Sequence, residues 1–554
     1  MPPAAHDAPA DTPPWLVTPL VHCETPLLAQ YRAALAQGAD LVELRVDRIG
    51  DVAACERFLE AVRGEGRTIL TIRAAAEGGA WDGDDDERIA LFERLGLLLP
   101  GWIDIELAAW ERSANLRQKI GLVASVEPAG AAATLQRPRN RLILSAHDWS
   151  ATPAEIDSAF DRFARAPAAI RKLAFTARDA SDALRLLNTL GGRAAETWAV
   201  LSMGFGGVAG RILAGARGSA LTFAAATPES SSAPGQPLLN ELLHEFRWRS
   251  IRLDTPVFGV VGWPVAHSRS PRLHNAAMRA ADIDGVYVPL AVASAPHDFA
   301  AFMDLLAEPG WHCVRGLSVT APHKEHALLW LQTGGGTATP LAQRCGAVNT
   351  LRRAADGHWI GDNTDYAGAL ASLAVAAGVA HDPTHGAIPE ISALRSALQS
   401  RRVELLGAGG AARAFAVALA DIGALVQICN RSPQRAADLA HRVRAATTAT
   451  CSVIDWDSRG LSDPALVVNC TTLGMQAADA SPLPAERLSA RCAVVETIYA
   501  PARTALLEDA RRCGARTAPG AVMFLAQAAE QFRIWHGKPI ADAALRAVWN
   551  EIAA

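Results

Sequence analysis

Residues 403–413 read VELLGAGGAAR, an apolar run that passes directly into a glycine-rich turn. A G-x-G-x-x-A string is a weak signal alone, because small residues also occur where helices pack closely. Here the run predicts a strand, and ARAFAVALADIG (412–423) predicts the helix that follows. Amide groups at the start of such a helix bind pyrophosphate. The stretch therefore predicts a Rossmann dinucleotide-binding domain over residues 400–520, with a cofactor-binding turn made of Gly407, Ala408, Gly409, Gly410 and Ala411.

The end of the next predicted strand, LVQIC (425–429), indicates which dinucleotide binds. It leads into Asn430, Arg431 and Ser432, with Arg435 one helical turn further on. A domain for NAD places an acidic residue here to accept a ribose hydroxyl, and this sequence offers none. A guanidinium group pairs instead with a 2′-phosphate. These four residues therefore predict NADP (NADPH) as the cofactor.

The first half of the chain, residues 15–248, repeats one pattern. Apolar, β-rich runs alternate with amphipathic helical stretches, and this alternation predicts an α/β fold, a (β/α)8 barrel. The eight runs are WLVTPLV (15–21), DLVELRV (40–46), TILTIR (68–73), WIDIEL (102–107), RLILSA (141–146), AIRKLAF (169–175), ETWAVLSM (196–203) and SALTFAA (219–225).

Polar residues interrupt or close these runs. In a (β/α)8 barrel, the catalytic and substrate-binding side chains lie at the ends of the strands. These polar residues are Glu43, Arg45, Arg73, His147 and Lys172. Lys172 is either an ordinary lysine at a strand edge or an amine whose lowered pKa lets it form an imine with a ketone. His147 alone would be interpreted as a loop histidine. Together, Lys172 and His147 suit the roles of a nucleophile and a proton acceptor.

Lysine usage supports that interpretation. Only four of the 53 basic residues are lysines: Lys119, Lys172, Lys324 and Lys538. An amine can lose its proton and act as a nucleophile or an acid, whereas a guanidinium cannot. We interpret Lys119 and Lys538 as surface residues and expect Lys172 and Lys324 to take part in catalysis.

Six short motifs in the first half resemble type I 3-dehydroquinate dehydratases when taken together and in order. They are ELRVD (43–47), R-x-x-x-EGG (73–79), SAHDW (145–149), RKLA (171–174), M-x-x-x-G-x-x-x-R (203–211) and SAPGQ (232–236). The resemblance implies that Lys172 forms the imine, that His147 is the general base and that Glu77 orients it. It implies that Arg211 holds the substrate carboxylate. It also implies that the remaining groups bind around the ring: Glu43, Arg45, Arg73, Ser232 and Gln236.

The second half carries hydroxyl and amide groups with one lysine and one aspartate, a set suited to a polyhydroxylated ring acid. These groups lie in VFGVVGWPVAHSRSPRLHN (257–275), GLSVTAPHKEHA (316–327), AVNTL (347–351) and GDNTDYAGA (361–369). A structural lysine at the start of a helix would oppose the helix dipole, which favours a chemical role for Lys324. With the glycine-rich turn, the half resembles shikimate dehydrogenases.

That resemblance implies a substrate lobe over residues 255–370, completed by 521–554, around the cofactor domain. It implies that Lys324 and Asp365 form the catalytic pair and that Ser268 and Ser270 bind the carboxylate. The ring pocket would be completed by Thr320, Asn349, Tyr499, Gln527 and Gln531, and Thr471 and Gly520 would line the nicotinamide. The stretch 381–400 appears in none of these motifs, and we expect a surface insertion there.

Composition excludes several classes of function. A net charge of −4 provides no basic footprint for nucleic acid, and no apolar run is long enough to cross a membrane. Nine scattered cysteines without a C-x-x-C pair argue against a zinc site and favour a cytoplasmic location. The first fourteen residues have no lysine or arginine and predict a disordered tail rather than a targeting segment.

We therefore expect a fused pair of enzymes that dehydrates 3-dehydroquinate and then reduces 3-dehydroshikimate to shikimate. Two alternatives stay open. The second half is a quinate dehydrogenase, against which the S-x-S turn with Thr320 argues, or the chain is a non-catalytic metabolite sensor. The four acid–base residues Lys172, His147, Lys324 and Asp365 argue against a sensor. The sequence does not predict an oligomeric state.

Overall fold

The computed structural model describes residues 14–63, 65–99, 101–125, 141–150, 152, 156–193, 196–379, 381–476 and 478–552. The chain forms two compact units, one mostly before Thr255 and one mostly after it. All but the last residue of the predicted tail lie outside the described residues. Among the described residues, no helix is both long enough and apolar enough to span a membrane.

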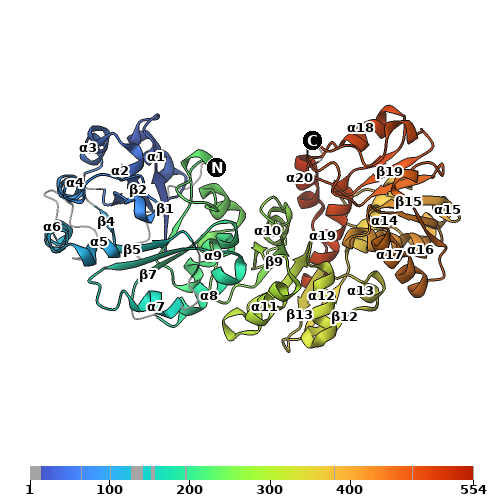
Figure 1. Ribbon diagram of the computed structural model, residues 1–554, viewed down its shortest axis with the longest axis horizontal. Coiled ribbons are helices and arrows are strands. Elements are labelled where there is room, and N and C mark those ends of the chain that lie inside the picture. Colours follow the sequence, from blue (N-terminus) through green and yellow to red (C-terminus); the bar gives the residue numbers. More distant parts are fainter. Residues whose placement is uncertain are drawn as a thin grey trace. The chain divides into compact units, whose positions relative to one another are not determined.

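The first unit contains eight parallel strands, each at one of the eight predicted runs (Figure 1). They are β1 (Trp15–Leu20), β2 (Leu41–Arg45), β3 (Thr68–Thr71), β4 (Trp102–Glu106), β5 (Leu142–Asp148), β6 (Ile170–Thr176), β7 (Trp198–Met203) and β8 (Leu221–Phe223). The sheet order runs β7-β6-β5-β4-β3-β2-β1-β8. A parallel bridge between Trp198 and Ser219 nearly closes the ring, which confirms the predicted barrel.

Helices follow the strands and cover the outside of the barrel. They are α1 (Leu27–Ala36), α2 (Val46–Ile49), α3 (Val52–Ala61), α4 (Asp85–Leu98), α5 (Leu107–Arg112), α6 (Ala114–Ser125), α7 (Ile156–Asp161), α8 (Ala180–Gly191) and α9 (Val208–Leu213). Alternate strand residues such as Val17, Ile69 and Leu201 fill the interior as a buried cluster. Because these apolar side chains fill the interior of the barrel, its polar side chains lie towards the carboxyl ends of the strands.

The second unit holds two six-stranded sheets. The first has the order β10-β9-β11-β13-β14-β12 and mixes parallel and antiparallel pairs. Its strands are β9 (Val257–Gly262), β10 (Val286–Ala291), β11 (Val314–Val319), β12 (Gly336–Ala338), β13 (Thr350–Arg353) and β14 (Trp359–Asp362). Its helices are α10 (Ser270–Ala280), α11 (Pro296–Ala307), α12 (Lys324–Trp330) and α13 (Pro340–Cys345).

The second sheet is parallel, in the order β17-β16-β15-β18-β19-β20. Its strands are β15 (Arg402–Leu406), β16 (Leu425–Cys429), β17 (Cys451–Ile454), β18 (Leu466–Asn469), β19 (Ala493–Glu496) and β20 (Thr517–Ala518). Counted from β15, this is the 3-2-1-4-5-6 order of a Rossmann fold. The order reverses between β15 and β18, where such folds bind their ligands.

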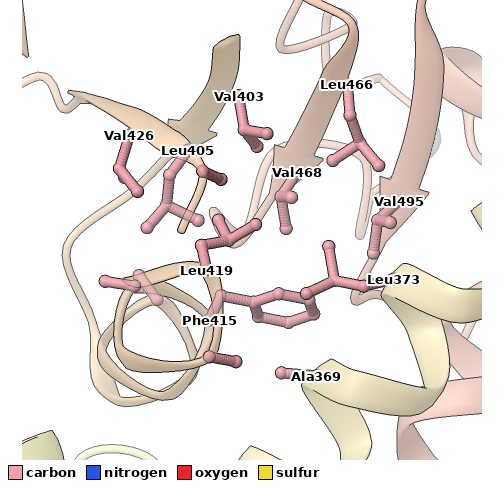
Figure 2. Packing of buried hydrophobic residues seen from close by; sticks show 14 of the residues in the cluster. Ala369, Leu373, Val403, Leu405, Phe415, Leu419, Val426, Leu466, Val468 and Val495 are labelled. Atoms are coloured by element: carbon pink, nitrogen blue, oxygen red, sulfur yellow. The ribbon is translucent and has the colours of Figure 1, made fainter. Parts of the chain in front are cut away.

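Helices α14 (Asp365–Ala377) and α16 (Gly410–Ile422) pack on this sheet. Figure 2 shows Phe415 and Leu419 of α16 meeting Leu373 of α14 and the strand valines in one buried cluster. The other helices of this part are α15 (Ile391–Leu398), α17 (Pro433–Ala446) and α18 (Ala505–Arg512). Leu394 and Leu398 of α15 are buried in the same cluster. The expected surface insertion at 381–400 is therefore wrong for its second half, which forms a packed helix.

The C-terminal helices α19 (Gly520–His536) and α20 (Asp542–Ile552) return to the first sheet of this unit. Helix α19 contacts β11 and β13, and α20 packs on α10. A buried hydrogen bond joins Gln531 Nε2 of α19 to the backbone oxygen of Asn349 at 3.1 Å, across 182 residues of sequence. The part of the second unit that contains its first sheet is thus built from segments that precede and follow the parallel sheet in the sequence.

Candidate active sites

A cavity opens at the ends of the barrel strands. Eight of the nine residues expected there line it: Glu43, Arg45, Arg73, Glu77, His147, Lys172, Arg211 and Ser232. The ninth, Gln236, does not. Its Oε1 accepts hydrogen bonds from the backbone N–H and the Oγ of Ser232, at 2.8 and 3.1 Å. Gln236 therefore shapes the loop that carries Ser232.

Lys172 lies within β6 and is buried. Its Nζ donates to Asp104 Oδ2 at 2.8 Å, lies 3.9 Å from Glu43 Oε1, and lies 4.5 Å from the centre of the Phe223 ring. Burial raises the pKa of Asp104, but the cations Arg73 and Lys172 more than offset this and hold that pKa well below its usual value. The buried amine is therefore compensated by charge in the absence of substrate.

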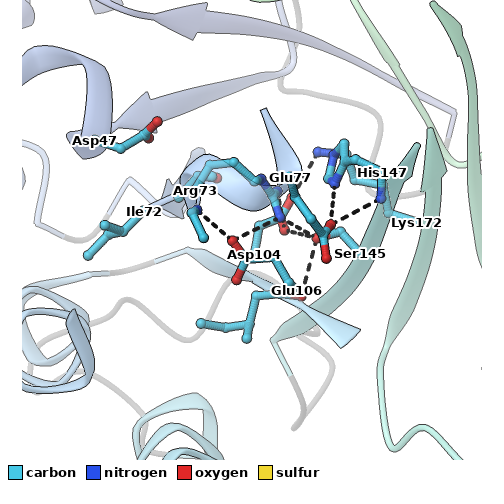
Figure 3. Close-up of polar contacts among 12 residues, drawn as sticks. Asp47, Ile72, Arg73, Glu77, Asp104, Glu106, Ser145, His147 and Lys172 are labelled. Carbon is cyan, nitrogen blue, oxygen red and sulfur yellow. Dashed lines mark hydrogen bonds and ion pairs between the residues drawn. The ribbon is translucent and has the colours of Figure 1, made fainter. Parts of the chain in front are cut away.

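His147 and Glu77 form a second pair, which is half-buried and which Figure 3 shows beside Lys172. His147 Nδ1 lies 3.0 Å from Glu77 Oε2, and the backbone N–H of His147 donates to the same oxygen at 3.0 Å. Burial, with the cations Arg73 and Lys172, holds the pKa of His147 well below its usual value. Burial raises the pKa of Glu77 to about 7, against the attraction of Arg73. The imidazole is therefore neutral at pH 7 and available to accept a proton.

Arg211 is a buried cation on the cavity wall, with only 1 % of its surface exposed. Its Nε has no hydrogen-bond partner among the described residues, and burial lowers its pKa to about 10. An uncompensated guanidinium at the wall of a cavity favours an anion there. Arg45 differs, because it already forms a two-pronged pair with Asp47 at 3.0 and 2.8 Å.

Sequence reasoning missed two acidic residues of β4. Arg73 donates to Asp104 Oδ1 at 2.7 Å, and Arg88 donates to Glu106 Oε1 at 3.0 Å. Asp104 and Glu106 are two positions apart and so face the same side of the strand. Two acids alternating in an apolar run, WIDIE, were the signal that could have found them, because buried carboxylates need cationic partners.

In the second unit, Lys324 and Asp365 meet as expected. Lys324 Nζ donates to Asp365 Oδ2 at 2.5 Å, and Asn349 Nδ2 donates to Asp365 Oδ1 at 2.9 Å. Lys324 is the first residue of α12 and Asp365 is the first residue of α14. Both oxygens of the carboxylate are thereby engaged, which fixes the ammonium group in one place.

A chain of hydrogen bonds extends from this pair through Gln531, which was expected in the ring pocket, to Ser318 and Tyr287, which were not among the expected site residues. Tyr287 Oη donates to Ser318 Oγ at 2.6 Å, and Ser318 Oγ donates to Gln531 Oε1 at 2.8 Å. Gln531 then donates to the backbone oxygen of Asn349. Tyr287 is on β10 and Ser318 is on β11, with β9 between them in the sheet, so only the fold brings the two side chains together.

The other residues expected in the ring pocket are less closely linked to the pair of Lys324 and Asp365. Ser270 begins α10, and its backbone N–H donates to Ser268 Oγ at 3.3 Å. The Tyr499 hydroxyl is hydrogen-bonded to Ser268. Thr320 follows β11, where its N–H donates to the Val261 oxygen at 2.8 Å. Gln527 donates to the Phe524 oxygen of its own helix at 3.0 Å.

The glycine-rich turn joins β15 to α16 as predicted, and its geometry fits a dinucleotide. Gly407 has φ +109°, and a Cβ there would lie 2.8 Å from the Cys470 oxygen. A Cβ on Gly409, which precedes the first residue of α16, would meet no atom within 4 Å. The helix N-terminus is therefore open to a phosphate group. Ala408 is buried in the core and Ala411 is half-buried.

The residues expected to bind the 2′-phosphate follow β16 in the sequence, and the residues expected near the nicotinamide follow β18 and β20. Arg431 and Arg435 are exposed beyond β16, and Asn430 Nδ2 donates to the Ser432 oxygen at 3.0 Å. Ser432 Oγ accepts from the Arg435 N–H and caps α17. Near the expected nicotinamide, Thr471 Oγ1 donates to Asn469 Oδ1 at 2.7 Å. Gly520 is needed for packing, since a Cβ there would lie 2.3 Å from the Ile498 oxygen.

Comparisons with known proteins match both halves of the chain. A family model described as type I 3-dehydroquinase matches residues 18–252, and one described as the shikimate dehydrogenase substrate binding domain matches residues 260–351. The chain is 34% identical over 507 residues to the bifunctional 3-dehydroquinate dehydratase/shikimate dehydrogenase, chloroplastic, of Arabidopsis thaliana, covering 91% of this chain and 78% of that relative.

Two further proteins match the second half alone. The chain is 43% identical over 290 residues to shikimate dehydrogenase (NADP(+)) of Acidiphilium cryptum, covering 52% of this chain and 93% of the relative. A solved structure of shikimate 5-dehydrogenase from Thermus thermophilus, in complex with NADP(H) and shikimate, is 30% identical with a TM-score of 0.44 and covers 54% of this chain and 99% of that chain.

Proposed function

This chain belongs to the family of bifunctional 3-dehydroquinate dehydratase/shikimate dehydrogenases, and from that premise we propose how its residues catalyse two successive steps. The barrel dehydrates 3-dehydroquinate to 3-dehydroshikimate. The second unit reduces 3-dehydroshikimate to shikimate with NADPH. The proposed domains are residues 15–248, 255–370 with 521–554, and 400–520.

In the barrel, the Lys172 amine attacks the substrate ketone and forms an iminium ion with loss of water. The iminium draws electrons from the adjacent carbon, whose proton passes to the neutral imidazole of His147. The substrate hydroxyl then leaves with that proton, and hydrolysis of the imine regenerates Lys172. Glu77 orients the imidazole at 3.0 Å, and Arg211 binds the substrate carboxylate.

In the second unit, NADPH when bound supplies the hydride for the ketone. The Lys324 ammonium donates a proton to the ketone oxygen, and Asp365 holds that ammonium in position at 2.5 Å. Asn349 fixes the carboxylate of Asp365, while Ser268 and Ser270 bind the substrate carboxylate. The glycine-rich turn holds the pyrophosphate, and Arg431 and Arg435 bind the 2′-phosphate.

The observation that carries the dehydratase proposal is the meeting in one cavity of Lys172, the His147–Glu77 pair and Arg211, whose Nε has no hydrogen-bond partner among the described residues. A single assay tests both activities. The protein is given 3-dehydroquinate and NADPH, and the absorbance of NADPH at its nicotinamide band is followed. Oxidation should require both halves, because 3-dehydroquinate must lose water before the second site reduces it. No oxidation with either 3-dehydroquinate or added 3-dehydroshikimate would refute the proposed reductase.

A cytoplasmic location completes the proposal. All nine cysteines lie in described residues and none of them is in a disulfide, which suits a reducing compartment. The relative from Arabidopsis thaliana is described as chloroplastic, so the compartment is tested separately by fractionating the native cells.

A further inference from the structure

One carboxylate beside the expected proton donor has no part in the chemistry above. Glu325 follows Lys324 in the first turn of α12. Its Oε2 accepts a hydrogen bond from Arg413 Nη2 at 2.8 Å, and its Oε1 lies 3.9 Å from Arg435 Nη2. Arg413 is on α16, directly after the glycine-rich turn, and Arg435 is on α17. One carboxylate thus connects the lysine's helix to two helices of the cofactor domain.

The charges around Glu325 do not balance among the described residues. Burial lowers the pKa of Arg413, Glu325 raises it, and the guanidinium groups of Arg442 and Arg435 lower it further. The Arg413 side chain is only 12% exposed, and its Nε has no hydrogen-bond partner. Two guanidinium groups, those of Arg413 and Arg435, therefore share the carboxylate of Glu325, and the guanidinium group of Arg442 adds a further positive charge beside Arg413. Such a cluster retains a net positive charge that a phosphate group can neutralise.

We propose that Glu325 is a positioning residue that connects the arginine expected at the cofactor 2′-phosphate with the lysine expected to donate the proton. Through Arg413 it fixes the first turn of α12, and so Lys324, against the glycine-rich turn. Through Arg435 it adds a negative charge near the 2′-phosphate and weakens the binding of that phosphate. The inference rests on the proposed function, because it needs NADPH as the cofactor.

Two variants separate these two effects. Glu325→Gln removes the charge but keeps an oxygen that can accept from Arg413, whereas Glu325→Ala removes both. Calorimetric titration with 2′,5′-ADP and with 5′-AMP, which lacks only the 2′-phosphate, measures the phosphate site without turnover. Glu325→Gln should bind 2′,5′-ADP about two- to fivefold more tightly, as expected for a partly exposed ion pair of up to about 1 kcal/mol. Its affinity for 5′-AMP should not change.

Kinetics of the reductase test the link to Lys324. Glu325→Ala should lower kcat at saturating NADPH, and Glu325→Gln should restore most of it, since the Arg413 contact is retained. The matched control is Glu508→Gln, which removes an exposed carboxylate paired with an arginine of its own helix at 3.2 Å. This control should match the wild type in both titrations and in kcat.

These measurements separate a failure of the proposed NADPH site from a failure of the role inferred for Glu325. If the wild type binds 2′,5′-ADP no better than 5′-AMP, the proposed cofactor is wrong. If the wild type discriminates but Glu325→Gln binds 2′,5′-ADP equally or more weakly, the inference is overturned. An Ala variant with unchanged kcat would also overturn the positioning role.

Discussion

The Lys324 side chain lies directly against Gly410 in the glycine-rich turn between β15 and α16. A Cβ built on Gly410 would come within 2.6 Å of Lys324 Cδ and 3.3 Å of its Cβ. The residue expected to donate the proton therefore depends on a missing side chain in the turn expected to hold the cofactor. This contact explains a glycine at a position that the dinucleotide motif itself leaves free.

Gly410→Ala should therefore impair reduction more than cofactor binding. The added methyl group forces the flexible lysine chain aside, and a displacement of about 1 Å from productive geometry can cost about a hundredfold in rate. We expect kcat for 3-dehydroshikimate to fall by about that factor, with the affinity for 2′,5′-ADP unchanged. Dehydratase activity in the same chain is the control. Full reductase activity in the variant would contradict the proposed position of Lys324.

Lys172→Arg should abolish dehydration and leave the reductase intact. A guanidinium keeps the positive charge beside Asp104 but cannot form an imine. Borohydride added with 3-dehydroquinate should fix a covalent mass on the wild-type peptide that contains Lys172, measured by mass spectrometry. Reduction of added 3-dehydroshikimate is unaffected in the variant. A covalent mass on another peptide would refute the assignment.

Arg211→Met should stabilise the empty protein while it destroys substrate binding. The wild-type guanidinium is buried without a hydrogen bond to its Nε, and replacing a poorly compensated buried charge by an apolar side chain can stabilise by about 1–4 kcal/mol. Thermal unfolding without ligand measures the gain for the barrel. The KM for 3-dehydroquinate should rise strongly. A destabilised variant with normal KM would show that Arg211 is a structural cation.

The rate of dehydration should rise with pH towards a plateau above about pH 7. Burial raises the pKa of Glu77 from 4.5 to about 7, so the orienting carboxylate is ionised only above that pH. The pKa of His147 is already well below that range. The profile of kcat/KM against pH measures this rise, and in Glu77→Gln the rise near pH 7 should disappear together with most of the activity.

The raised pKa of Glu77 also makes the stability of the folded barrel depend on pH. A pKa raised in the folded state means that the folded protein binds the proton more tightly than the unfolded chain. Glu77 should therefore destabilise the barrel progressively as the pH rises from 4.5 to about 7. Glu77→Gln should remove this part of the pH dependence in thermal unfolding. A variant with the wild-type dependence would show that Glu77 titrates normally.

Local patterns in the sequence predicted the elements well. The eight apolar runs of the first half became the eight barrel strands, because each run fits one buried parallel strand. The stretch VELLGAGGAAR became β15, the turn and the start of α16. The stretch 381–400 was misjudged because α15 is short, and only its contact with α14 and α16 makes it part of the core.

Contacts between distant residues were harder to predict. Asp104 and Glu106 were visible as acids in a strand, but their partners Arg73 and Arg88 come from other elements. Nothing in the order of residues 287, 318 and 531 indicates that their side chains form one chain of hydrogen bonds. Glu325 likewise looks like an ordinary acid at a helix start until the fold brings Arg413 to it.

The return of α19 to β11 and β13 determines when each enzyme can be finished during synthesis. The barrel is complete once β8 has left the ribosome, so its site can assemble while the rest of the chain is still being made. Asn349 must wait for Gln531, which is translated 182 residues later. A nascent chain should therefore gain the ability to remove water from its substrate well before it can reduce the product.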